Sequence, residues 1–542
     1  MTNRRSPILI GLTVFLVAIA MRTIPLYWSP LPFNLDGIKF AALARTTLRY
    51  NHLPLSKGYF NADVPVFTML LALTSRVTGV TPLYIAQIFT ASIGGTVCLF
   101  VVVITQRIGV RLQKASYNIK IAAAIAGLVL ATEGIFLGRS AAVTSEGVGH
   151  LFSILSLYVF AHALWSPRPA WILLTGLLFF LFPLTHNLST IVGAFSAVSL
   201  LVLALQDSVS IPKLRLNTLV AGFWIYTGIY YTSSSMKEIG RVSSVPGLFV
   251  AWVIVLLLST AYILTSKPRF QREISLGMLF VGGSLVIINY FTPVFPGTAT
   301  GNLFTVLFIL PIAVIGIVAF WGIPSIVQAH IEGYATVALL IGTLSLIGFA
   351  LTAGLTVQYQ DLAVRGQIFL HIALAILAGI GTISLSRNGS RSTLKNILPV
   401  IIIVCSIVSA PLAFSGLHAT SAQPLVMQTE FETATFAVEH ANNWTSDGHI
   451  TKLASDHTLT QSTGSRRGVY QWLRGDGSKP ICPVISQRSW VTVGAQLFPS
   501  SPAEVSQELY RSFIRSRNKV YTTTGRDPTA ITTPLIDNKE RC

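Results

Sequence analysis

The stretch Phe33-Asn34-Leu35-Asp36-Gly37 follows the first long apolar run of the chain, residues 6–24. Asp36 is the only acidic residue among the first 60. It lies between two membrane-seeking segments, where a carboxylate can be held at the edge of a bilayer. Asp is also a favoured N-cap residue, so by position alone Asp36 could equally cap a short interfacial helix. The sequence of the flanking segments is needed to distinguish these two interpretations.

The composition indicates an integral membrane protein. Over 542 residues the mean hydropathy is +0.65 and only 11% of residues are charged, which excludes a soluble domain. Apolar runs of about 17–25 residues recur before position 414, and each can cross a bilayer. We therefore expect an α-helical polytopic protein with about thirteen transmembrane helices. The runs lie near residues 6–24, 83–105, 121–137, 147–164, 171–185, 188–206, 218–234, 246–265, 274–290, 303–322, 335–354, 368–385 and 396–414.

The net charge of +18 is unevenly distributed. Residues 415–542 hold 13 Lys and Arg against 11 Asp and Glu, so the basic excess belongs to the membrane part. This excess indicates anionic lipid headgroups and loop topology, and no arginine- or aromatic-rich stretch points to nucleic acid. Arg4 and Arg5 precede the first run and place the N-terminus in the cytoplasm. Loops rich in Lys and Arg alternate along the chain with loops that contain fewer of these residues, which predicts that the C-terminus lies outside the cell membrane.

Two segments of the first outer loop favour helices that lie on the membrane. Residues 38–50 place apolar and basic side chains on opposite faces at helical spacing. Residues 64–80 form a short apolar run that Arg76 interrupts. If this run crossed the membrane, the strongly basic loop after residue 105 would fall outside. We therefore predict a second surface or partly re-entrant helix.

The composition changes after Phe414, where long apolar runs end. We expect a membrane domain over residues 1–414 and a small extracytoplasmic α/β domain over residues 415–542. Alternating residues at 490–493 and 519–523 predict strands, and residues 502–516 predict a helix. Cys482 and Cys542 could form a disulfide outside the cytoplasm, whereas Cys98 and Cys405 lie within apolar runs.

Ionisable side chains gather at the predicted outer ends of the spans. Such a residue at membrane depth is costly and is a functional candidate by default. Most other charges lie in the predicted cytoplasmic loops, as topology alone requires. The set comprises Asp36, Lys39, Asp63, Arg139, Glu146, His186, Lys237, Glu238, Arg241, Asp361 and Arg365. The sequence therefore places the polar chemistry at the outer face.

Two stretches carry a resemblance to a known family. Asn61-Ala-Asp63-Val-Pro-Val-Phe-Thr-Met-Leu-Leu is followed by Gly79-Val-Thr-Pro-Leu and by Gly94-Gly95 in the second span. This order resembles the GT-C glycosyltransferases, in particular the protein O-mannosyltransferase and lipid A aminoarabinose transferase-like group. That group has a lone Asp in the first outer loop and then a His-Pro-Pro-Leu-like helix start. Here Asp63-Val64-Pro65-Val66 takes the place of that start, and only the second Pro matches.

The second stretch is Phe136-Leu-Gly-Arg139-Ser-Ala-Ala-Val-Thr-Ser-Glu146. It resembles the family's Ser-Arg-x-x-Arg segment with an acid several residues later. Arg139 and Glu146 match, whereas Ala142 lies near the place of the second Arg. The resemblance covers about residues 6–165 in recognisable order, and the remainder of the chain agrees in span count and topology only.

The resemblance implies that a sugar is transferred from a polyprenyl-phosphate donor to a glycan, lipid or protein acceptor at the outer membrane face. Asp36 is then the expected general base, and attack opposite the phosphate leaving group inverts the anomeric centre. A guanidinium can bind phosphate oxygens in a bidentate manner, so arginines near Asp36 are expected to hold the donor. The expected donor- and substrate-binding residues are Lys39, Asp63, Arg139, Glu146, His186, Arg241 and Arg365.

Each candidate has a purely structural alternative. Arg139 and Glu146 could simply pair, because a buried charge needs a partner. Arg365 could be an interfacial anchor, and His186 could satisfy backbone groups at a tight hairpin. Asp63 could cap the helix that follows it.

No obligatory cofactor is expected. In the oligosaccharyltransferase branch of the superfamily several acids bind a divalent cation. The present chain has no Asp-x-Asp pair, and Trp472-Leu-Arg-Gly-Asp is only distantly similar to that branch's tail motif. Two other functions compete with glycosyl transfer: a secondary transporter and a non-catalytic membrane scaffold. The chain shows no evident transporter-type repeat, and its polar groups lie at the outer ends of the spans rather than at mid-bilayer.

Overall fold

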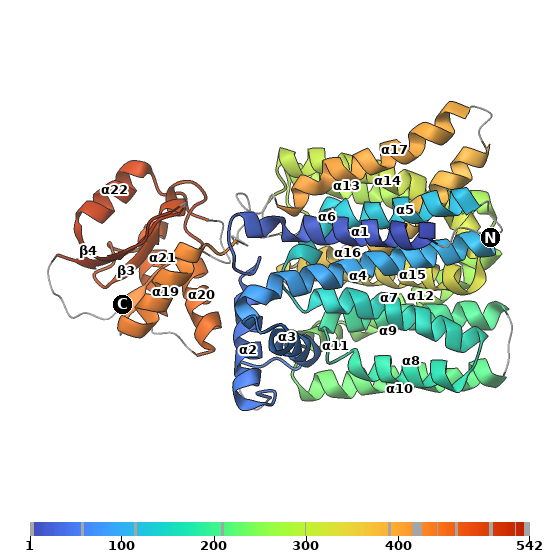
Figure 1. The fold of residues 1–542 in the computed structure, drawn as a ribbon, viewed down its shortest axis with the longest axis horizontal. Helices are drawn as coiled ribbons and strands as arrows, with labels where there is room; N and C mark the ends of the chain where they lie inside the picture. Colours follow the sequence, from blue (N-terminus) through green and yellow to red (C-terminus); the bar gives the residue numbers. More distant parts are fainter. Residues whose placement is uncertain are drawn as a thin grey trace.

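The structure is a computed structural model. It describes residues 5–535 except 56–58, 113–115, 208–210, 297, 299, 389–391, 415–424, 442, 461–463, 498–501 and 526. A long bundle of helices is followed by a small α/β unit, residues 425–535, which we call the tail (Figure 1). The N-terminus lies at the end of the bundle opposite the tail.

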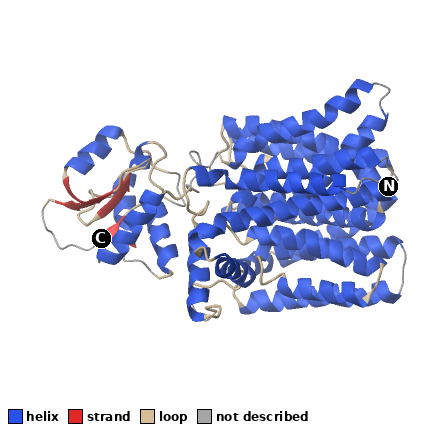
Figure 2. Cartoon of the chain, in the orientation of Figure 1, coloured by secondary structure: helices blue, strands red, loops and turns tan. Residues whose placement is uncertain are grey.

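The described residues of the bundle form helices and the loops that connect them (Figure 2). Most helices run side by side along its long axis (Figure 1). The bounds are α1 Arg5–Thr23, α2 Asp36–Tyr50, α3 Pro65–Thr78, α4 Pro82–Arg111, α5 Ser116–Thr132, α6 Gly134–Ala141, α7 Glu146–Trp165, α8 Pro169–Leu181, α9 Asn187–Asp207, α10 Ile211–Ser233, α11 Lys237–Ser243, α12 Pro246–Thr265, α13 Pro268–Phe291, α14 Leu303–Val327, α15 His330–Ala353, α16 Val357–Asn388 and α17 Ser392–Ser409.

Twelve of the thirteen predicted runs each overlap one α-helix, and the run at 121–137 covers parts of α5 and α6. Fewer of these helices are long and apolar enough to count as spans. Within the described parts of the chain, nine helices are long and apolar enough to cross a membrane, or ten if α5 and α6 form one bent span. The predicted run at 121–137 contains this 60° bend between α5 and α6. α8 and α17 are shorter apolar helices, so the number of thirteen remains a prediction.

The two expected surface helices lie across the end of the bundle. α2 runs nearly perpendicular to the bundle helices, and α3 is seen end-on beside it (Figure 1). Phe40, Leu43 and Phe67 form one buried cluster between the two helices and α4. The predicted outer loop therefore forms a packed layer at the end of the bundle that faces the tail.

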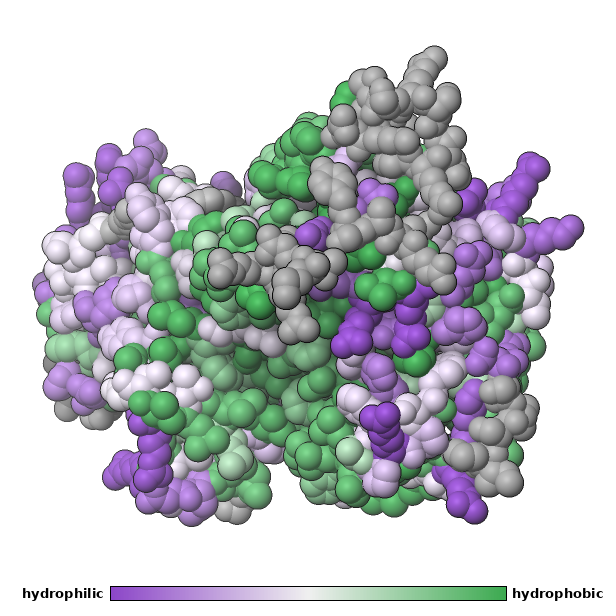
Figure 3. All heavy atoms as spheres, turned by 45° about the vertical axis from the view of Figure 1, so that its right-hand side comes forward, coloured by the Kyte–Doolittle hydropathy of each residue, from purple (hydrophilic) through white to green (hydrophobic). Residues whose placement is uncertain are grey.

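The surface of the bundle is apolar between two more polar ends (Figure 3). Large apolar side chains are exposed on its outer helices, such as Leu258 on α12, Phe280 on α13 and Leu310 on α14. Exposed apolar area of this extent is expected where lipid is the solvent. The chain is thus an integral membrane protein, as predicted.

The tail is a five-stranded sheet with helices on both faces. The strand order is β2-β1-β3-β5-β4; β1 is parallel to β2 and β3, and β5 is antiparallel to β3 and β4. Adjacent residues of β3 point to opposite faces: Val484 packs with α21 and α22, and Ile485 packs with α19 and α20. The bounds are α19 Gln428–His440, β1 Trp444–Thr445, α20 Gly448–Thr458, β2 Gly464–Ser465, α21 Arg467–Arg474, β3 Val484–Gln487, α22 Gln507–Arg515, β4 Arg517–Thr522 and β5 Thr529–Pro534.

One predicted strand of the tail is wrong. Residues 488–491 form a 3-10 turn, because Trp490 is buried there and donates its Nε1–H to Asp447 at 3.1 Å. The other predicted strand lies in β4, and the predicted helix at 502–516 is the shorter α22, which Ser506 caps. Cys482 is disulfide-bonded, while Cys542 lies outside the described residues.

A buried polar cluster in the tail makes its stability depend on pH. His449 Nε2 lies 3.1 Å from Glu430 Oε2, and both side chains are fully buried. Burial disfavours the imidazolium, but the adjacent Glu430 outweighs it, so the pKa of His449 is raised. Burial raises the pKa of Asp527 to about 6, and the nearby Glu430 adds to this rise.

These shifts predict that the tail loses stability as the pH rises from 5 to 8. The raised pKa of His449 gives stability that is present below about pH 6.5 and lost as pH rises through the folded-state pKa. Charging Asp527 costs stability between about pH 4 and pH 6, by at most about 3 kcal/mol and less after solvent screening. Thermal unfolding of the full chain, followed by tryptophan fluorescence, tests this. His449→Gln should flatten the upper pH window and Asp527→Asn the lower one; equal pH slopes in all three proteins would contradict the assignment.

Candidate functional site

A cavity of about 220 Å³ lies where the outer loop meets the bundle. It gathers seven of the eight residues that the sequence analysis selected for the catalytic and binding roles. Its polar lining residues are Asp36, Lys39, Asn61, Asp63, Arg139, Thr144, Ser145, Glu146, His186, Asn187 and Arg365. The cavity therefore collects side chains from α2, α6, α7, α16 and the loops before α3 and α9.

Backbone contacts place the Asp36 loop against the α6–α7 connection. The Val143 N–H donates to Phe33 O at 2.8 Å, and Phe33 N–H donates to Gln87 Oε1 at 2.9 Å. Asn34 has φ 95°, and its side-chain oxygen accepts the Asp36 N–H at 3.3 Å. This turn starts α2 at Asp36 itself, with Leu35 as the N-cap residue. Asp36 is thus not the cap, and its carboxylate points to a different partner.

Gly37 is required by this close approach. A Cβ at position 37 would lie 2.5 Å from Pro32 Cβ and 2.9 Å from Val143 Cβ, atoms that cannot swing aside. We expect Gly37→Ala to displace the start of α2 and to cost about 1–3 kcal/mol. Thermal unfolding of the purified chain measures this cost. Gly176→Ala is the matched control, because a Cβ there meets no atom within 4 Å; equal unfolding temperatures for the two variants would contradict this packing.

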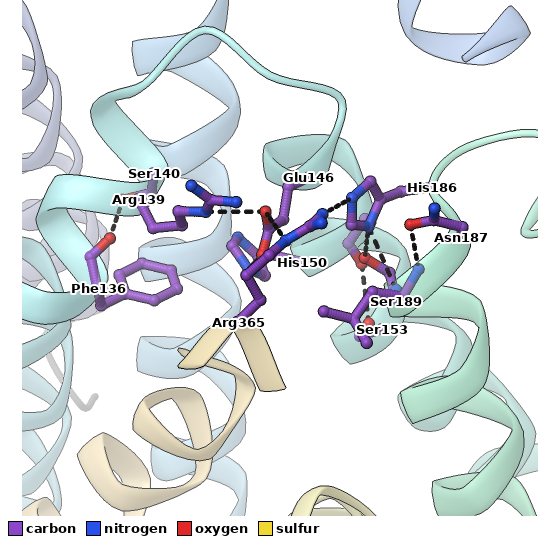
Figure 4. A network of polar contacts seen from close by, with 12 residues as sticks. Phe136, Arg139, Ser140, Glu146, His150, Ser153, His186, Asn187, Ser189 and Arg365 are labelled. Atoms are coloured by element: carbon purple, nitrogen blue, oxygen red, sulfur yellow. Dashed lines mark hydrogen bonds and ion pairs between the residues drawn. The ribbon is translucent and has the colours of Figure 1, made fainter. Parts of the chain in front are cut away.

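Glu146 is the centre of a charged network (Figure 4). Its Oε2 accepts Arg139 Nε–H at 2.9 Å and Arg365 Nε–H at 3.3 Å. Only 1% of the Glu146 side chain is exposed, against 33% for Arg139 and 20% for Arg365. Among the described residues Glu146 Oε1 has no hydrogen-bond partner. One buried carboxylate thus orients two arginines that reach the cavity.

His186 extends this network. Arg365 Nη2 lies 2.7 Å from His186 Nε2, and His186 Nδ1 lies 2.8 Å from Ser189 Oγ. A guanidinium nitrogen only donates, so His186 Nε2 accepts from Arg365, while the Ser189 backbone N–H donates to His186 Nδ1 at 3.3 Å. His186 is therefore neutral in this arrangement and fixes Arg365 from the side opposite Glu146. His186 also accepts a backbone N–H, that of Ser189, so the hairpin alternative and the side-chain network hold together.

The remaining sequence candidates lie beside this network. Arg241 does not line the cavity; its Nη2 lies 3.4 Å from Asp361 Oδ2, which is 3.6 Å from Arg365 Nη1. Asp361 belongs to α16, because that helix begins at Val357 rather than near residue 368 as predicted. Val64 is the N-cap residue of α3, while Asp63 is buried in the cavity wall. Lys237 begins α11 outside the cavity, and the Glu238 side chain lies outside the described part of the chain.

The sequence analysis missed two ionisable residues that position α6, the helix that carries Arg139. Glu133 is the N-cap of α6: it accepts from Ile135 N–H and Phe136 N–H at 2.8 and 3.0 Å, and His371 Nδ1 lies 3.0 Å away. Arg22 is fully buried and donates its Nε–H to Ser140 Oγ at 3.0 Å. Both lie within runs that were interpreted only as spans. The sequence does contain a sign of their importance, since an ionisable residue inside a transmembrane span is unusual.

The third missed residue comes from the tail. Lys452 on α20 donates from Nζ to Asp36 Oδ1 at 2.8 Å and to Asp456 Oδ2 at 2.7 Å. Burial alone would raise the pKa of Asp36, but Lys452, Arg139 and Lys39 outweigh it, so the pKa is lowered. The carboxylate is therefore ionised in this arrangement.

The charges of the cavity do not fit a divalent cation. Among the residues that the structure describes, no three His, Cys, Asp or Glu side chains are grouped so as to hold a metal ion. Asp36 is paired with Lys452 and Glu146 with two arginines, so these carboxylates are already neutralised by side chains. Independence of the chemistry from metal remains a prediction.

Solved structures share this architecture. The oligosaccharyltransferase of Archaeoglobus fulgidus in the apo form gives a TM-score of 0.54 at 11% identity, over 90% of this chain and 70% of that chain. Its structure tethered to an acceptor peptide with the NVT sequon gives 0.51 at 12% identity, over 89% and 69%. Its complex with Zn and sulfate gives 0.50 at 12% identity, over 97% and 73%.

The fold is that of the GT-C glycosyltransferases. This confirms the fold predicted from the sequence, including the α-helical membrane part and the small C-terminal α/β part. No protein-family model matches the chain, and no curated protein sequence matches it significantly. At 11–12% identity the likeness concerns the GT-C fold alone. The function has to be argued from the site.

Proposed function

We propose that this chain is a GT-C glycosyltransferase that moves a sugar from a polyprenyl-phosphate donor to an acceptor at the extracytoplasmic membrane face. The observation that carries the proposal is one cavity, between α2 and the helix bundle, that holds both a carboxylate on α2 and two arginines clamped by Glu146. These are the two kinds of group that displacement of a phosphate by a hydroxyl requires.

The arginines suit the donor phosphate. A lipid-linked sugar brings its anionic phosphate to headgroup depth, and the proposal requires Arg139 on α6 and Arg365 on α16 to lie at that depth. Arg139 uses Nε for Glu146, and a guanidinium has five N–H donors in a planar fork that matches phosphate oxygens. Their fixed orientation favours the charge that develops on the leaving phosphate.

Asp36 suits the general base. Its side chain is half-exposed at the cavity, so an acceptor hydroxyl can reach it. In the proposed step the hydroxyl oxygen bonds to the anomeric carbon as the bond from that carbon to the phosphate oxygen breaks. The hydroxyl proton passes to Asp36, and the electron pair leaves with the polyprenyl phosphate. Attack from the side opposite the phosphate inverts the anomeric centre.

Glu146 acts in the proposed site through the two arginines. Its Oε1 is buried and lies 4.0 Å from His150 Nε2, too far for a hydrogen bond. The carboxylate therefore acts on the proposed substrate by orienting Arg139 and Arg365. Lys39, Asp63 and His186 complete the lining on the proposed substrate, and Arg241 supports Arg365 through Asp361.

A transfer assay tests the proposal. Membranes that contain native chain are incubated with radiolabelled polyprenyl-phosphate sugars, and the label in the acceptor fraction is compared with that for Asp36→Asn at equal expression. The proposal expects label with at least one donor and loss of label in the variant. No label from any donor would overturn it in favour of a transporter or a scaffold, and equal label would remove Asp36 from the mechanism.

A further inference from the structure

The tail contributes a side chain to the candidate site. Lys452 Nζ contacts Asp36 Oδ1 at 2.8 Å, although 416 positions separate the two residues in the chain. The Lys452 and Asp36 side chains are 45% and 50% exposed, so the pair lies at the open side of the cavity rather than inside a core. The membrane part alone therefore does not contain all the groups that face Asp36.

Apolar packing fixes α20 above α2. Leu35 and Ile38 of the outer loop share one buried cluster with Ile450 and Leu453 of α20. Arg45 Nη2 also donates to His457 O at 2.8 Å, near the other end of the contact. Lys452 is thus held over Asp36 by its neighbours in the helix, and the ion pair does not have to position the tail by itself.

The contact sets the electrostatics of Asp36. The charged groups that face Asp36 are Lys39 from α2, Arg139 from α6, and Lys452 with Asp456 from α20. Burial alone would raise the pKa of Asp36. Lys452 is the strongest of the charges that lower this pKa, and these charges outweigh burial, so the pKa of Asp36 is lowered. A carboxylate that is ion-paired in this way is a weak base. Before Asp36 can take a proton from an acceptor hydroxyl, Lys452 has to release the Asp36 carboxylate.

Asp456 offers Lys452 an alternative partner. It lies one helical turn after Lys452 and accepts from the same ammonium at 2.7 Å. An ammonium has three donors, so Lys452 bridges both carboxylates in the present arrangement. Lys452 can therefore leave Asp36 without losing its counter-charge.

We propose that Lys452 is a positioning residue supplied by the tail, which holds Asp36 toward the cavity and passes to Asp456 when an acceptor hydroxyl binds Asp36. The inference rests on the proposed function of Asp36 as the base. No covalent bond changes at Lys452, and the proton of the acceptor goes to Asp36. The site is then composite, and docking of the tail is part of its assembly.

The first experiment measures Asp36 without any substrate. Carbodiimide labelling of Asp36 in the purified full chain is followed by mass spectrometry as a function of pH. Removing a contacting cation should shift the labelling midpoint upward by about 1 to 3 pH units in Lys452→Met. Lys452→Arg should stay near the native midpoint, and so should Lys519→Met, which removes an exposed lysine from β4. A midpoint that is the same in Lys452→Met and native chain overturns the inference.

The second experiment uses transfer. The acid limb of the pH–rate profile should move upward with the labelling midpoint in Lys452→Met, and Lys452→Arg should restore it. Asp456→Asn should raise the acceptor KM, because the Lys452 ammonium then has no second carboxylate to pair with when it leaves Asp36. If native chain transfers sugar and the acid limb of Lys452→Met lies at the same pH as that of native chain, the role of Lys452 is overturned and the proposed function stays intact. Absence of transfer by native chain, whatever the labelling midpoint, overturns the proposed function and the role of Lys452 in it.

Discussion

Glu146→Gln is expected to cause the largest combined loss of stability and of transfer. The change removes the charge that Arg139 and Arg365 share while keeping the shape of the side chain. Leaving buried cations without a counter-charge costs about 3–5 kcal/mol in a fully buried site. Because 33% and 20% of the two arginine side chains are exposed, we expect about 2–3 kcal/mol. Thermal unfolding of the purified chain in detergent measures this.

Transfer by Glu146→Gln should fall further than stability alone explains. The two guanidiniums repel each other once Glu146 is neutral, so they no longer keep the spacing that the proposed phosphate site needs. Asp361→Asn is the matched control, since Asp361 contacts the same Arg365 at 3.6 Å but is 46% exposed. Asp361 also contacts Arg241 at 3.4 Å, and the loss of these two exposed pairs should stay within about 1 kcal/mol. Equal effects of the two variants would show that burial of Glu146 does not matter.

Asp36→Asn is expected to have the largest effect on transfer with an unchanged fold. Loss of a positioned general base typically lowers the rate by about 10²- to 10⁴-fold. Asp36 is half-exposed and its ion pair with Lys452 lies at the cavity mouth, so stability should change by less than about 1 kcal/mol. Rates of sugar transfer and unfolding temperatures are measured on the same preparations.

The control for this variant is Asp476→Asn, which removes an exposed carboxylate from the tail far along the chain from Lys452. It should transfer at the native rate. If Asp36→Asn also transfers at the native rate, the base is another group. If it unfolds at a much lower temperature, its loss of transfer reflects misfolding and carries no information about the base.

The sequence predicted the membrane part well because long apolar runs have few alternatives to a transmembrane helix. It also selected most of the cavity, since charges at the outer ends of spans have to converge at one membrane face. Asp361 was misplaced in a loop because α16 extends outward beyond its apolar run. The bend between α5 and α6 was missed because Glu133 caps a new helix inside a run that is apolar on average.

Lys452 could not have been found in the same way. It is one of 13 basic residues of the predicted tail, and nothing in its local pattern distinguishes it from a solvated lysine. Its contact with Asp36 depends on how the α19 and α20 face of the sheet packs on Leu31, Leu35 and Ile38. Docking of two parts through apolar side chains leaves no periodic signal in the sequence, so only the structure brings this pair together.

The most direct test of the central claim uses purified chain with polyprenyl-phosphate sugars and a panel of glycan, lipid and peptide acceptors. Release of polyprenyl phosphate and formation of glycosylated acceptor are measured in the same reaction, and the anomeric configuration of the product is determined by NMR. The account predicts equal amounts of the two products, an inverted anomeric centre, and loss of both products in Asp36→Asn. Release of polyprenyl phosphate without glycosylated acceptor, or a retained configuration, would contradict it.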